Sequence, residues 1–400
     1  MNIILTVEDL GIGGAQVFVM RLGQALRNAG HTVLIYSHYA HLSNAALRAQ
    51  LAPDVDVYEY GHKLPQLDYL IRKAEGLLRR LGLQTNLRER LVSQKLRALV
   101  HKYRPHVVNS HTIKADYVAA QALADQEHAA LVITMHGCYE LFLRHANAVE
   151  VVPKGRYALQ RAKAFIYLTD KNLEIFTASA VRALTALPHY KIYNGFEGQF
   201  SPIDKRPTRE TLGIKSSDMV FGMVARGIAE KGWQFAIHSF LSVADKFSDA
   251  HLILVGDSDY LTVLQATYQN SRIHFVGHSS NPIDWVALFD VGLLPSYFHA
   301  ESLPNSIAEY LSCGKPVVAS RIGEVPKMLE SPAGLAGILI DQANWQLTNP
   351  EQLTEALNIY LTQPLVLAEH AQRAVQAFDK FRMAKCVAAY ERVFAAAQLN

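Results

Sequence analysis

Short apolar runs alternate along the chain with longer segments whose apolar residues recur at helical spacing. Strand-like runs in the first half lie at residues 2–7, 32–36, 106–109, 130–134 and 164–168. Those in the second half lie at residues 219–224, 252–255, 273–276, 291–294, 316–319 and 337–340. After the first run, residues 17–29 have helical periodicity, and Gly30 follows as the expected helix end. This alternation predicts an α/β fold with two doubly wound domains on parallel sheets.

The segment 194–207 separates the two halves. It contains an Asn-Gly pair, two prolines and several charges, which is typical of a linker. The chain has 400 residues, half of them hydrophobic, and this exceeds what one core usually supports. We therefore expect an N-terminal domain at residues 1–193 and a second domain that begins at residue 194.

Composition argues against several classes of protein. The three cysteines at positions 138, 313 and 386 are far apart and match no zinc or disulfide pattern, which suits a reducing cytosol. The opening MNIILTVEDL lacks the features of a signal sequence, and no apolar run has the length of a membrane span. We expect a cytoplasmic protein.

The formal net charge of +3 is unevenly distributed along the chain. Residues 61–104 contain eleven Lys/Arg and three Asp/Glu, against 28 and 33 in the remainder. Mixed with leucines, these cations can lie on an anionic membrane surface, or they can belong to ordinary solvated helices. The segment has only two aromatic residues, Tyr69 and Tyr103, too few for a platform that stacks nucleic-acid bases. We expect no nucleic-acid partner.

Polar residues follow the second-half runs where parallel strands end, which is where open α/β sheets bind ligands. They are Arg226, Asp257, His278, Ser296 and Arg321. Arg226 and Lys231 share one loop with glycines on both sides. Two fixed cations in such a loop can offset the charge that builds on a departing diphosphate, although a basic loop is often simply solvated.

Two glutamates mark the segment 295–320. Pro304 is expected at the first helical position and Gly314 just past the helix end, which leaves Glu301 in the preceding loop and Glu309 on the helix. The free N–H groups at such a helix start can bind a phosphate, while Glu309 accepts hydrogen bonds from a ribose and Glu301 faces a sugar. The alternative is that Glu301 caps the helix and Glu309 is a solvated helix residue.

The first half carries a glycine-rich turn, GIGGAQ, and two histidines that follow predicted strands. Gln16 stands where a dinucleotide fingerprint needs its third glycine, and no acidic residue ends the second strand, so nicotinamide binding is not expected. Gly13 and Gly14 can approach a bound phosphate or sugar, or they can simply form a turn. We expect His136 to hydrogen-bond a sugar hydroxyl and His111 to be a structural histidine under a loop.

Taken in order, these motifs resemble glycosyltransferase family 4, whose members have the GT-B architecture of two Rossmann-like domains facing across a cleft. The resemblance covers nearly the whole chain and rests on GGAQVFVMRLGQALRNAGHTV, NSHT, TMHG, KIYNGFEGQF, GMVARGIAEKGW, HLILVGD, IHFVGH and VGLLPSYFHAESLPNSIAEYLSCGKPVVAS. The Arg-x4-Lys pair followed by Glu-x7-Glu is its most specific part. The chain departs from the family at Ala225, where glycine is common, at Gly227, which replaces a leucine, and at Tyr310, which replaces an alanine.

The resemblance implies a role for each matching position. Arg226 and Lys231 would bind the donor diphosphate, Glu309 the ribose, and Glu301 the transferred sugar near its reacting carbon. His136 would contact the donor sugar. The turn at Gly13 and Gly14 would approach the diphosphate, the backbone of Ser302, Leu303, Pro304 and Asn305 would hold sugar and phosphate oxygens, and Gly277 and His278 would lie near the base. The resemblance also implies that the helix at 372–400 returns to the first domain, so that residues 194–371 form the donor-binding domain.

These roles imply a retaining transferase that moves a sugar from a nucleotide-diphosphate sugar to a hydroxyl of a glycan or lipid-linked acceptor. Cell-surface polysaccharide or glycolipid biosynthesis is the expected context, with residues 61–104 on the cytoplasmic face of a membrane. No metal or other cofactor is expected, because cations and a helix start can offset the charge of the leaving group. The alternatives are a nucleotide-sugar epimerase, another GT-B enzyme, or a non-catalytic nucleotide-sugar-binding subunit.

Overall fold

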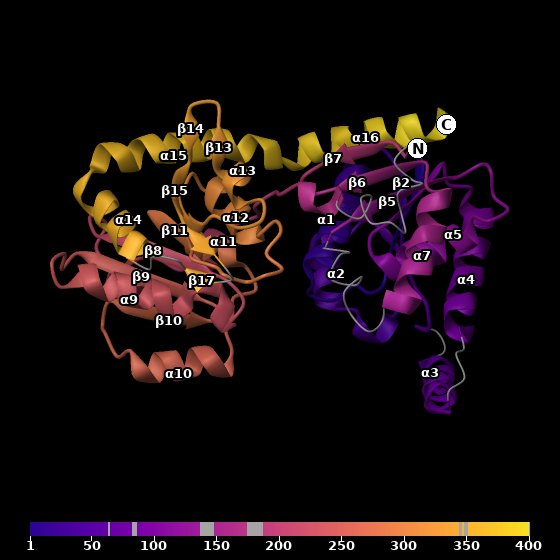
Figure 1. Cartoon of the computed structure of the whole chain (residues 1–400), viewed down its shortest axis with the longest axis horizontal. Coiled ribbons are helices and arrows are strands. Elements are labelled where there is room, and N and C mark those ends of the chain that lie inside the picture. The colour runs from indigo at the N-terminus through magenta and orange to yellow at the C-terminus, as the bar shows by residue number, and fades with distance from the viewer. Residues whose placement is uncertain are drawn as a thin grey trace. The chain divides into compact units, whose positions relative to one another are not determined.

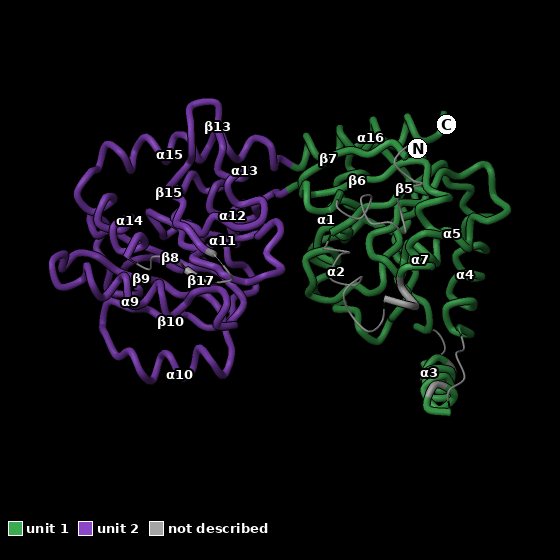
Figure 2. The backbone as a smooth tube through the Cα atoms, in the orientation of Figure 1, with its two compact units in different colours: residues 1–195, 383–400 green, residues 196–382 purple. Residues whose placement is uncertain are grey.

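The chain forms two compact units in the computed structural model, which describes residues 1–62, 65–81, 86–136, 148–173, 187–343, 346–347 and 351–399. Unit 1 consists of Met1–Gly195 and Met383–Asn400, and unit 2 consists of Phe196–Arg382 (Figure 2). The chain enters and leaves unit 2 at adjacent points, since the Phe196 N–H donates to the Phe381 carbonyl over 2.7 Å. Each unit is an α/β domain, as the sequence predicts.

Unit 1 is built on a seven-stranded parallel sheet (Figure 1). In spatial order its strands are β3 (Asp56–Glu59), β2 (Thr32–Ser37), β1 (Asn2–Val7), β4 (Val107–Ser110), β5 (Ala130–Met135), β6 (Ala164–Tyr167) and β7 (His189–Lys191). Strands β1 and β4 are neighbours, but the chain continues from them toward opposite edges of the sheet. The topological switch of this sheet therefore lies between β1 and β4.

Successive residues of β1 face opposite helix layers. Ile3, Leu5 and Val7 pack in one core, whereas Ile4 packs in the other. The first layer contains α1 (Gly14–Asn28), α2 (Ala45–Leu51) and α16 (Met383–Leu399), and the second contains α4 (Leu87–Tyr103), α5 (Ile113–Ala122) and α7 (Ala148–Arg161). A further helix, α3 (Pro65–Arg80), packs against α4.

Unit 2 is built on a six-stranded parallel sheet. In spatial order its strands are β10 (Ile273–Gly277), β9 (Ala250–Val255), β8 (Met219–Val224), β11 (Val291–Leu294), β12 (Val317–Ser320) and β15 (Gly337–Ile340). Two short antiparallel pairs are added, β13 (Glu330–Ser331) with β14 (Gly334–Leu335) and β16 (Gln342–Ala343) with β17 (Gln346–Leu347). The topological switch of this sheet lies between β8 and β11.

Helices cover both faces of the unit 2 sheet. On one face, α9 (Trp233–Ala244), α10 (Asp259–Thr267) and α14 (Glu351–Thr362) share a core with Phe221 and Met223 of β8. The other helices are α11 (Pro282–Val286), α12 (Asn305–Ser312), α13 (Val325–Leu329) and α15 (Pro364–Phe378). Of these, α12 contacts β11 and β12, and α15 contacts α12 and α13.

The return to unit 1 begins later than residue 372. Helix α15 stays in unit 2, with Ala374 and Ala377 fully buried there, and the chain enters unit 1 at Met383. The sequence did not predict β3 and β7, because both lie at edges of the sheet and lack the continuous apolar run of a strand buried on both faces. The other strands of the two parallel sheets lie within two residues of their predicted bounds.

Candidate functional site

The candidate residues of unit 2 stand at the topological switch of its sheet. Arg226 and Lys231 follow β8, and Ser296 and Glu301 follow β11, the strand hydrogen-bonded beside it. The chain leaves these two strands toward opposite edges. In open α/β sheets, ligands bind at the carboxyl ends of strands where the connections diverge in this way.

Two glycines shape the loop that follows β8. Gly232 has a φ of +86°, and a Cβ at this position would lie 2.0 Å from the Pro295 carbonyl oxygen, so only glycine lets this loop approach the loop after β11. At Gly227 a Cβ would lie 2.4 Å from Oγ of Ser258, which donates to the Gly227 carbonyl over 2.6 Å. This contact gives a steric reason for glycine where the family commonly has leucine.

Lys231, Glu301 and Ser296 form one buried cluster. The Lys231 Nζ lies 2.5 Å from Glu301 Oε2, and the Ser296 hydroxyl donates to the same oxygen over 2.8 Å. Lys231 and Glu301 are each 7% exposed, and Ser296 is fully buried. A buried charge is costly unless it is paired, so each of the two charges requires the other. The sequence assigned Lys231 and Glu301 to different parts of a donor, and the structure brings the two side chains into direct contact.

Arg226 is exposed and joins this cluster through the ring of Phe298. Its Cζ lies 5.0 Å from the ring centroid, and the Lys231 Nζ lies 5.2 Å from the same centroid. Cations at this distance are attracted by the quadrupole of an aromatic ring. Sequence reasoning did not identify Phe298, because an aromatic residue in a loop does not reveal which cations it will contact.

Helix α12 begins one residue later than the sequence predicts. Pro304 precedes the helix as its N-cap with an extended backbone, φ −67° and ψ 120°, because its ψ is outside the helical region. Glu301 does not cap the helix, since its carboxylate binds Lys231 and Ser296, so that alternative is wrong. The first N–H groups of α12 lack intrahelical acceptors, and the helix dipole favours an anion at this end. Gly314 follows the helix with a φ of +66°.

The loop between Glu301 and α12 is held against a neighbouring loop. The Glu324 N–H donates to the Ser302 carbonyl over 3.0 Å, and a Cβ at Gly323 would lie 2.4 Å from the Glu301 carbonyl oxygen. The Ser302 Oγ is enclosed and has no hydrogen-bond partner among the residues that the structure describes. Leu303, the last residue before Pro304, is half-buried.

The remaining unit 2 candidates lie outside this cluster. Glu309 is half-buried in the second turn of α12. Gly277 has a φ of +80° and ends the edge strand β10, where its carbonyl accepts the Gly256 N–H over 3.0 Å. His278 follows it and is exposed. Within the described part of the chain, no hydrogen bond or ion pair links His278 to Lys231 or Glu301.

The glycine-rich turn of unit 1 leads directly into α1. Gly13 is the N-cap and Gly14 the first helical residue, and no side chain caps the helix. The Asp9 carboxylate accepts the Gly11 N–H over 2.9 Å and the Gln16 amide over 3.3 Å, which fixes the turn beside β1. The start of α1 thus offers backbone N–H groups at the carboxyl end of a strand next to the switch.

The two candidate histidines of unit 1 are hydrogen-bonded to each other. His111 Nδ1 lies 2.9 Å from His136 Nε2, and the rings are stacked with their centroids 5.2 Å apart. Burial lowers the pKa of His136 to about 3, and burial together with the neighbouring His136 lowers the pKa of His111 well below its usual range. Both rings are therefore neutral at pH 7, and one nitrogen of the pair donates to the other. Their outer nitrogens, His111 Nε2 and His136 Nδ1, have no protein partner within the described residues.

This pair changes the interpretation of both residues. The sequence separated a structural His111 from a ligand-binding His136, but the structure makes them one hydrogen-bonded unit. They follow β4 and β5, which are adjacent strands, so their proximity follows from the strand order. Gly137, which follows His136, and Cys138 lie outside the described residues.

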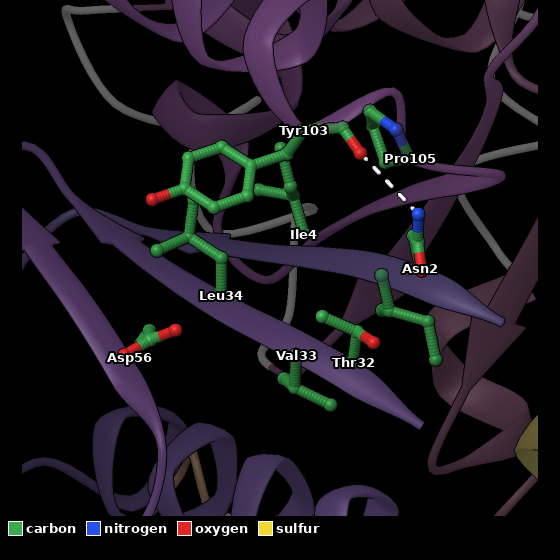
Figure 3. A pocket seen from close by; sticks show the side chains of 9 residues that line it. Asn2, Ile4, Thr32, Val33, Leu34, Asp56, Tyr103 and Pro105 are labelled. Atoms are coloured by element: carbon green, nitrogen blue, oxygen red, sulfur yellow. Dashed lines mark hydrogen bonds between the residues drawn. The ribbon is translucent and has the colours of Figure 1, made fainter. Parts of the chain in front are cut away.

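A cavity in unit 1 lies at the opposite end of the sheet. It is lined by the starts of β1 and β2 and by the end of α4, where the Tyr103 carbonyl accepts the Asn2 amide over 3.3 Å (Figure 3). Its volume of about 10 Å³ is room for one water and not for a sugar. The carboxyl ends of the strands, and not this cavity, carry the candidate chemistry.

Two further findings concern metals and membranes. Within the described residues, no group of three or more His, Cys, Asp or Glu side chains could hold a metal ion. No described helix combines the length and the apolarity that crossing a bilayer requires.

Comparison with known proteins gives two family matches and several relatives. Residues 12–186 match the family described as Glycosyltransferase Family 4, and residues 218–363 match the family described as Glycosyl transferases group 1. The chain is 23% identical over 393 residues to N-acetyl-alpha-D-glucosaminyl L-malate synthase of Bacillus anthracis, covering 96% of this chain and 94% of that protein. It is 23% identical over 334 residues to the capsular polysaccharide biosynthesis glycosyltransferase CapM of Staphylococcus aureus, covering 74% and 80% respectively.

Among solved structures, the fold is similar to that of HepE from Anabaena in complex with UDP. The TM-score is 0.73 at 20% sequence identity, over 99% of this chain and the whole of that one. A glycosyltransferase from Rickettsia africae gives the same TM-score of 0.73 at 14% identity. At such identities the likeness concerns the fold.

Proposed function

Because the chain is a glycosyltransferase of the family 4 type with the GT-B fold, we propose that it transfers a sugar from a nucleotide-diphosphate sugar with retention of the anomeric configuration. The observation that carries the proposal is the arrangement at the unit 2 switch. There two cations, a carboxylate and the start of α12 follow adjacent strands. Related structures of HepE contain UDP or UDP-glucose, which supports a nucleotide donor.

The arrangement suits a reaction whose main difficulty is charge on the leaving group. As the bond between the sugar and the diphosphate breaks, its electron pair stays on the phosphate oxygen. Arg226, Lys231 and the N-terminus of α12 offset this charge. Because these groups are already oriented, they stabilise the transition state more than water molecules would. The acceptor oxygen bonds to the same face of the anomeric carbon, and its proton passes to the departing phosphate oxygen.

The other candidate residues have supporting roles in this proposal. Glu301 binds the transferred sugar and Glu309 the ribose, while the backbone from Ser302 to Asn305 holds sugar and phosphate oxygens. Gly277 and His278 lie near the base. In unit 1, Gly13, Gly14 and His136 bind the donor, and the neutral state of His136 suits a hydroxyl more than a phosphate.

The proposal also covers cofactor and acceptor. The cations and the helix start take the place of a divalent metal, so no metal is required. The acceptor is a hydroxyl of a glycan or a lipid-linked saccharide. Similarity to a transferase of capsular polysaccharide biosynthesis supports this acceptor class.

A donor screen tests the proposal. UDP-, GDP- and ADP-sugars are added to the protein in the presence of EDTA, and thermal stabilisation is recorded for each. We expect one nucleotide class to raise Tm, and transfer to a simple saccharide acceptor to give a product with the donor's anomeric configuration by NMR. No stabilisation by any nucleotide sugar, or an inverted product, would contradict the proposal.

Helix α3 supports a peripheral membrane contact. Tyr69, Leu70 and Leu77 are each more than half exposed, and Lys73 and Arg80 are exposed beside them at helical spacing. Such a face binds anionic lipid through apolar insertion together with about 1 kcal/mol for each basic residue near the headgroups. We propose that this face, and not the whole basic segment 61–104, contacts the membrane on its cytoplasmic side.

Part of the basic segment is occupied inside the protein. The buried Arg88 guanidinium lies 2.8 Å from Asp68 and 4.0 Å from the centre of the Tyr39 ring, so it is not available to lipid. Arg72 also pairs with Asp68, at 3.0 Å. The segment 61–104 therefore offers fewer unpaired positive charges to a membrane than its count of basic residues suggests.

Vesicle sedimentation tests the membrane proposal. The double variant Leu70→Ser/Leu77→Ser should reduce binding to vesicles of phosphatidylcholine with phosphatidylglycerol by about tenfold, because two apolar side chains no longer insert. The control is Leu365→Ser, which changes a leucine of unit 2 that is still more exposed, at 84%. Equal binding of the double variant and the control would contradict the proposal.

A further inference from the structure

Among the described residues, hydrogen bonds reach only one of the two oxygens of the Glu301 carboxylate. Its Oε2 receives both the Lys231 ammonium, at 2.5 Å, and the Ser296 hydroxyl, at 2.8 Å. Its Oε1 receives no hydrogen bond from the residues that the structure describes. An ionised carboxylate can accept about four hydrogen bonds, so Oε1 retains its full capacity for an outside donor.

Ser296 is built into the structure at this point. It is fully buried, two residues after β11 ends, and its Oγ accepts the Phe298 N–H over 3.3 Å. The hydroxyl has one proton to give, and the Glu301 oxygen at 2.8 Å is a closer and charged acceptor compared with the Glu230 carbonyl at 3.3 Å. The Ser296 hydroxyl therefore donates its hydrogen bond to the Glu301 carboxylate.

The backbone of Glu301 is also fixed. Its N–H donates to the Phe298 carbonyl over 2.9 Å, and its carbonyl oxygen lies where a Cβ at position 323 would clash, so that glycine is required there. With its N–H hydrogen-bonded, its carbonyl packed beside Gly323 and Oε2 held by Lys231 and Ser296, the carboxylate has its direction set before any ligand arrives. Such preorganisation is what a group that binds a reacting sugar requires.

We infer that Ser296 is a positioning residue that acts through Glu301 and aims Oε1 at a hydroxyl of the donor sugar. The inference rests on the proposed function and adds a residue and an atom to it. Ser296 also gives the buried carboxylate a partner when the Lys231 ammonium turns toward the diphosphate. A carboxylate held by the lysine alone would lose its partner in that movement.

The first test is Ser296→Ala, measured with the donor found in the screen, UDP-glucose being the first probe, and with UDP alone. We expect kcat/KM for transfer to fall on the order of 10- to 100-fold, as for loss of a hydrogen bond to a charged group, while Kd for UDP stays within about twofold. The control Ser239→Ala removes a buried hydroxyl from α9 and should leave both values unchanged. Turnover of Ser296→Ala within about twofold of the unmodified protein overturns the inference.

A double-mutant cycle separates positioning from a general structural role. In a Glu301→Gln background, Ser296→Ala should lower kcat/KM by less than about twofold, because the group through which it acts is already altered. Equal losses in both backgrounds overturn the inference. If Ser296→Ala is poorly folded, Ser296→Cys preserves the volume with a weaker donor and takes its place in the cycle. If the unmodified protein binds and transfers from no nucleotide sugar, the proposed function itself fails, which is a different outcome.

Discussion

The two parallel sheets have the same strand order around their topological switches, but their carboxyl edges carry different candidate groups. At the switch of unit 2, a buried lysine, a buried glutamate and an exposed arginine gather around one serine and one aromatic ring. At the switch of unit 1, a glycine turn lies beside β1 and a neutral pair of histidines follows β4 and β5. The candidate groups at the unit 2 edge are fixed charges, whereas those at the unit 1 edge are a neutral histidine pair and backbone N–H groups, beside a turn fixed by the Asp9 carboxylate.

The comparison teaches how one fold can divide the work of a transfer reaction. Fixed cations stabilise an anionic leaving group, so in the proposed reaction the departure of the diphosphate depends on unit 2. Neutral imidazoles and backbone N–H groups suit the hydroxyls of sugars, which carry no charge. The electrostatic contribution to catalysis should therefore be concentrated in unit 2, and acid sensitivity of the fold in unit 1.

The largest expected effect follows from replacing Lys231, which should impair both transfer and the stability of unit 2. Lys231→Met should reduce transfer by about a thousandfold or more, because a cation at the leaving group is lost. It should also lower the free energy of unfolding by about 3–5 kcal/mol, because Glu301 is left buried without its cation. The burial of the pair is what couples the loss of this charge to stability. Urea unfolding and steady-state kinetics measure the two effects.

Arg226→Met is the matched comparison for Lys231→Met. Arg226 is exposed, so its loss should reduce transfer strongly with less than about 0.5 kcal/mol of change in stability. The double variant Lys231→Met/Glu301→Gln should recover most of the lost stability without recovering transfer. Near-normal turnover of Lys231→Met would contradict the proposal that the Lys231 cation stabilises the leaving group.

The next effect is acid destabilisation of unit 1. Burial lowers the pKa of His38 and of His136 to about 3, and the pKa of His111 is also lowered. These side chains are protonated in the unfolded chain below about pH 6.5 but stay neutral in the folded unit, so their stabilising contribution is complete above that pH. It is lost at about 1.4 kcal/mol per pH unit for each histidine as the pH falls toward 3.

The two units can be followed separately. All three tryptophans, at positions 233, 285 and 345, belong to the sequence of unit 2, so their fluorescence reports that unit. Amide hydrogen exchange of β1, β4 and β5 reports unit 1. Between pH 6 and pH 4 we expect protection to fall in unit 1 before the fluorescence changes, and His111→Asn to reduce the pH dependence. If protection in unit 1 and the fluorescence of unit 2 change at the same pH, the expected difference in acid sensitivity between the units is contradicted.

The smallest effect compares one buried tyrosine in each unit. The Tyr310 hydroxyl accepts the Val224 N–H over 2.7 Å and donates to the Leu293 carbonyl over 3.2 Å, which ties the ends of β8 and β11 together. Tyr310→Phe leaves the Val224 N–H buried without a partner and should cost about 1–3 kcal/mol of stability. In unit 1 the Tyr390 hydroxyl makes one longer hydrogen bond, 3.4 Å to Thr134, so Tyr390→Phe should cost less. Chemical unfolding measures both, and an equal or larger loss for Tyr390→Phe would contradict the comparison.

By itself, the sequence determined the fold class and eleven of the thirteen strands of the two parallel sheets, and it predicted the edge of each sheet where function is expected. This is because strands buried on both faces need continuous apolar runs, and because the carboxyl ends of parallel strands share one edge. It also pointed to Arg226, Lys231 and Glu301 in unit 2, since these residues stand in the loops that follow such runs.

Only the tertiary structure decided which of these residues touch. Periodicity gives the position of a strand along the chain but not its neighbour in the sheet, so the pairing of β8 with β11 and of β4 with β5 comes from the fold. These pairings placed Ser296 and Lys231 on one oxygen of Glu301, and joined two histidines that the sequence had separated. The burial of Lys231 and Arg88 was likewise invisible in the sequence, because whether a charge is solvated or paired depends on what packs over it.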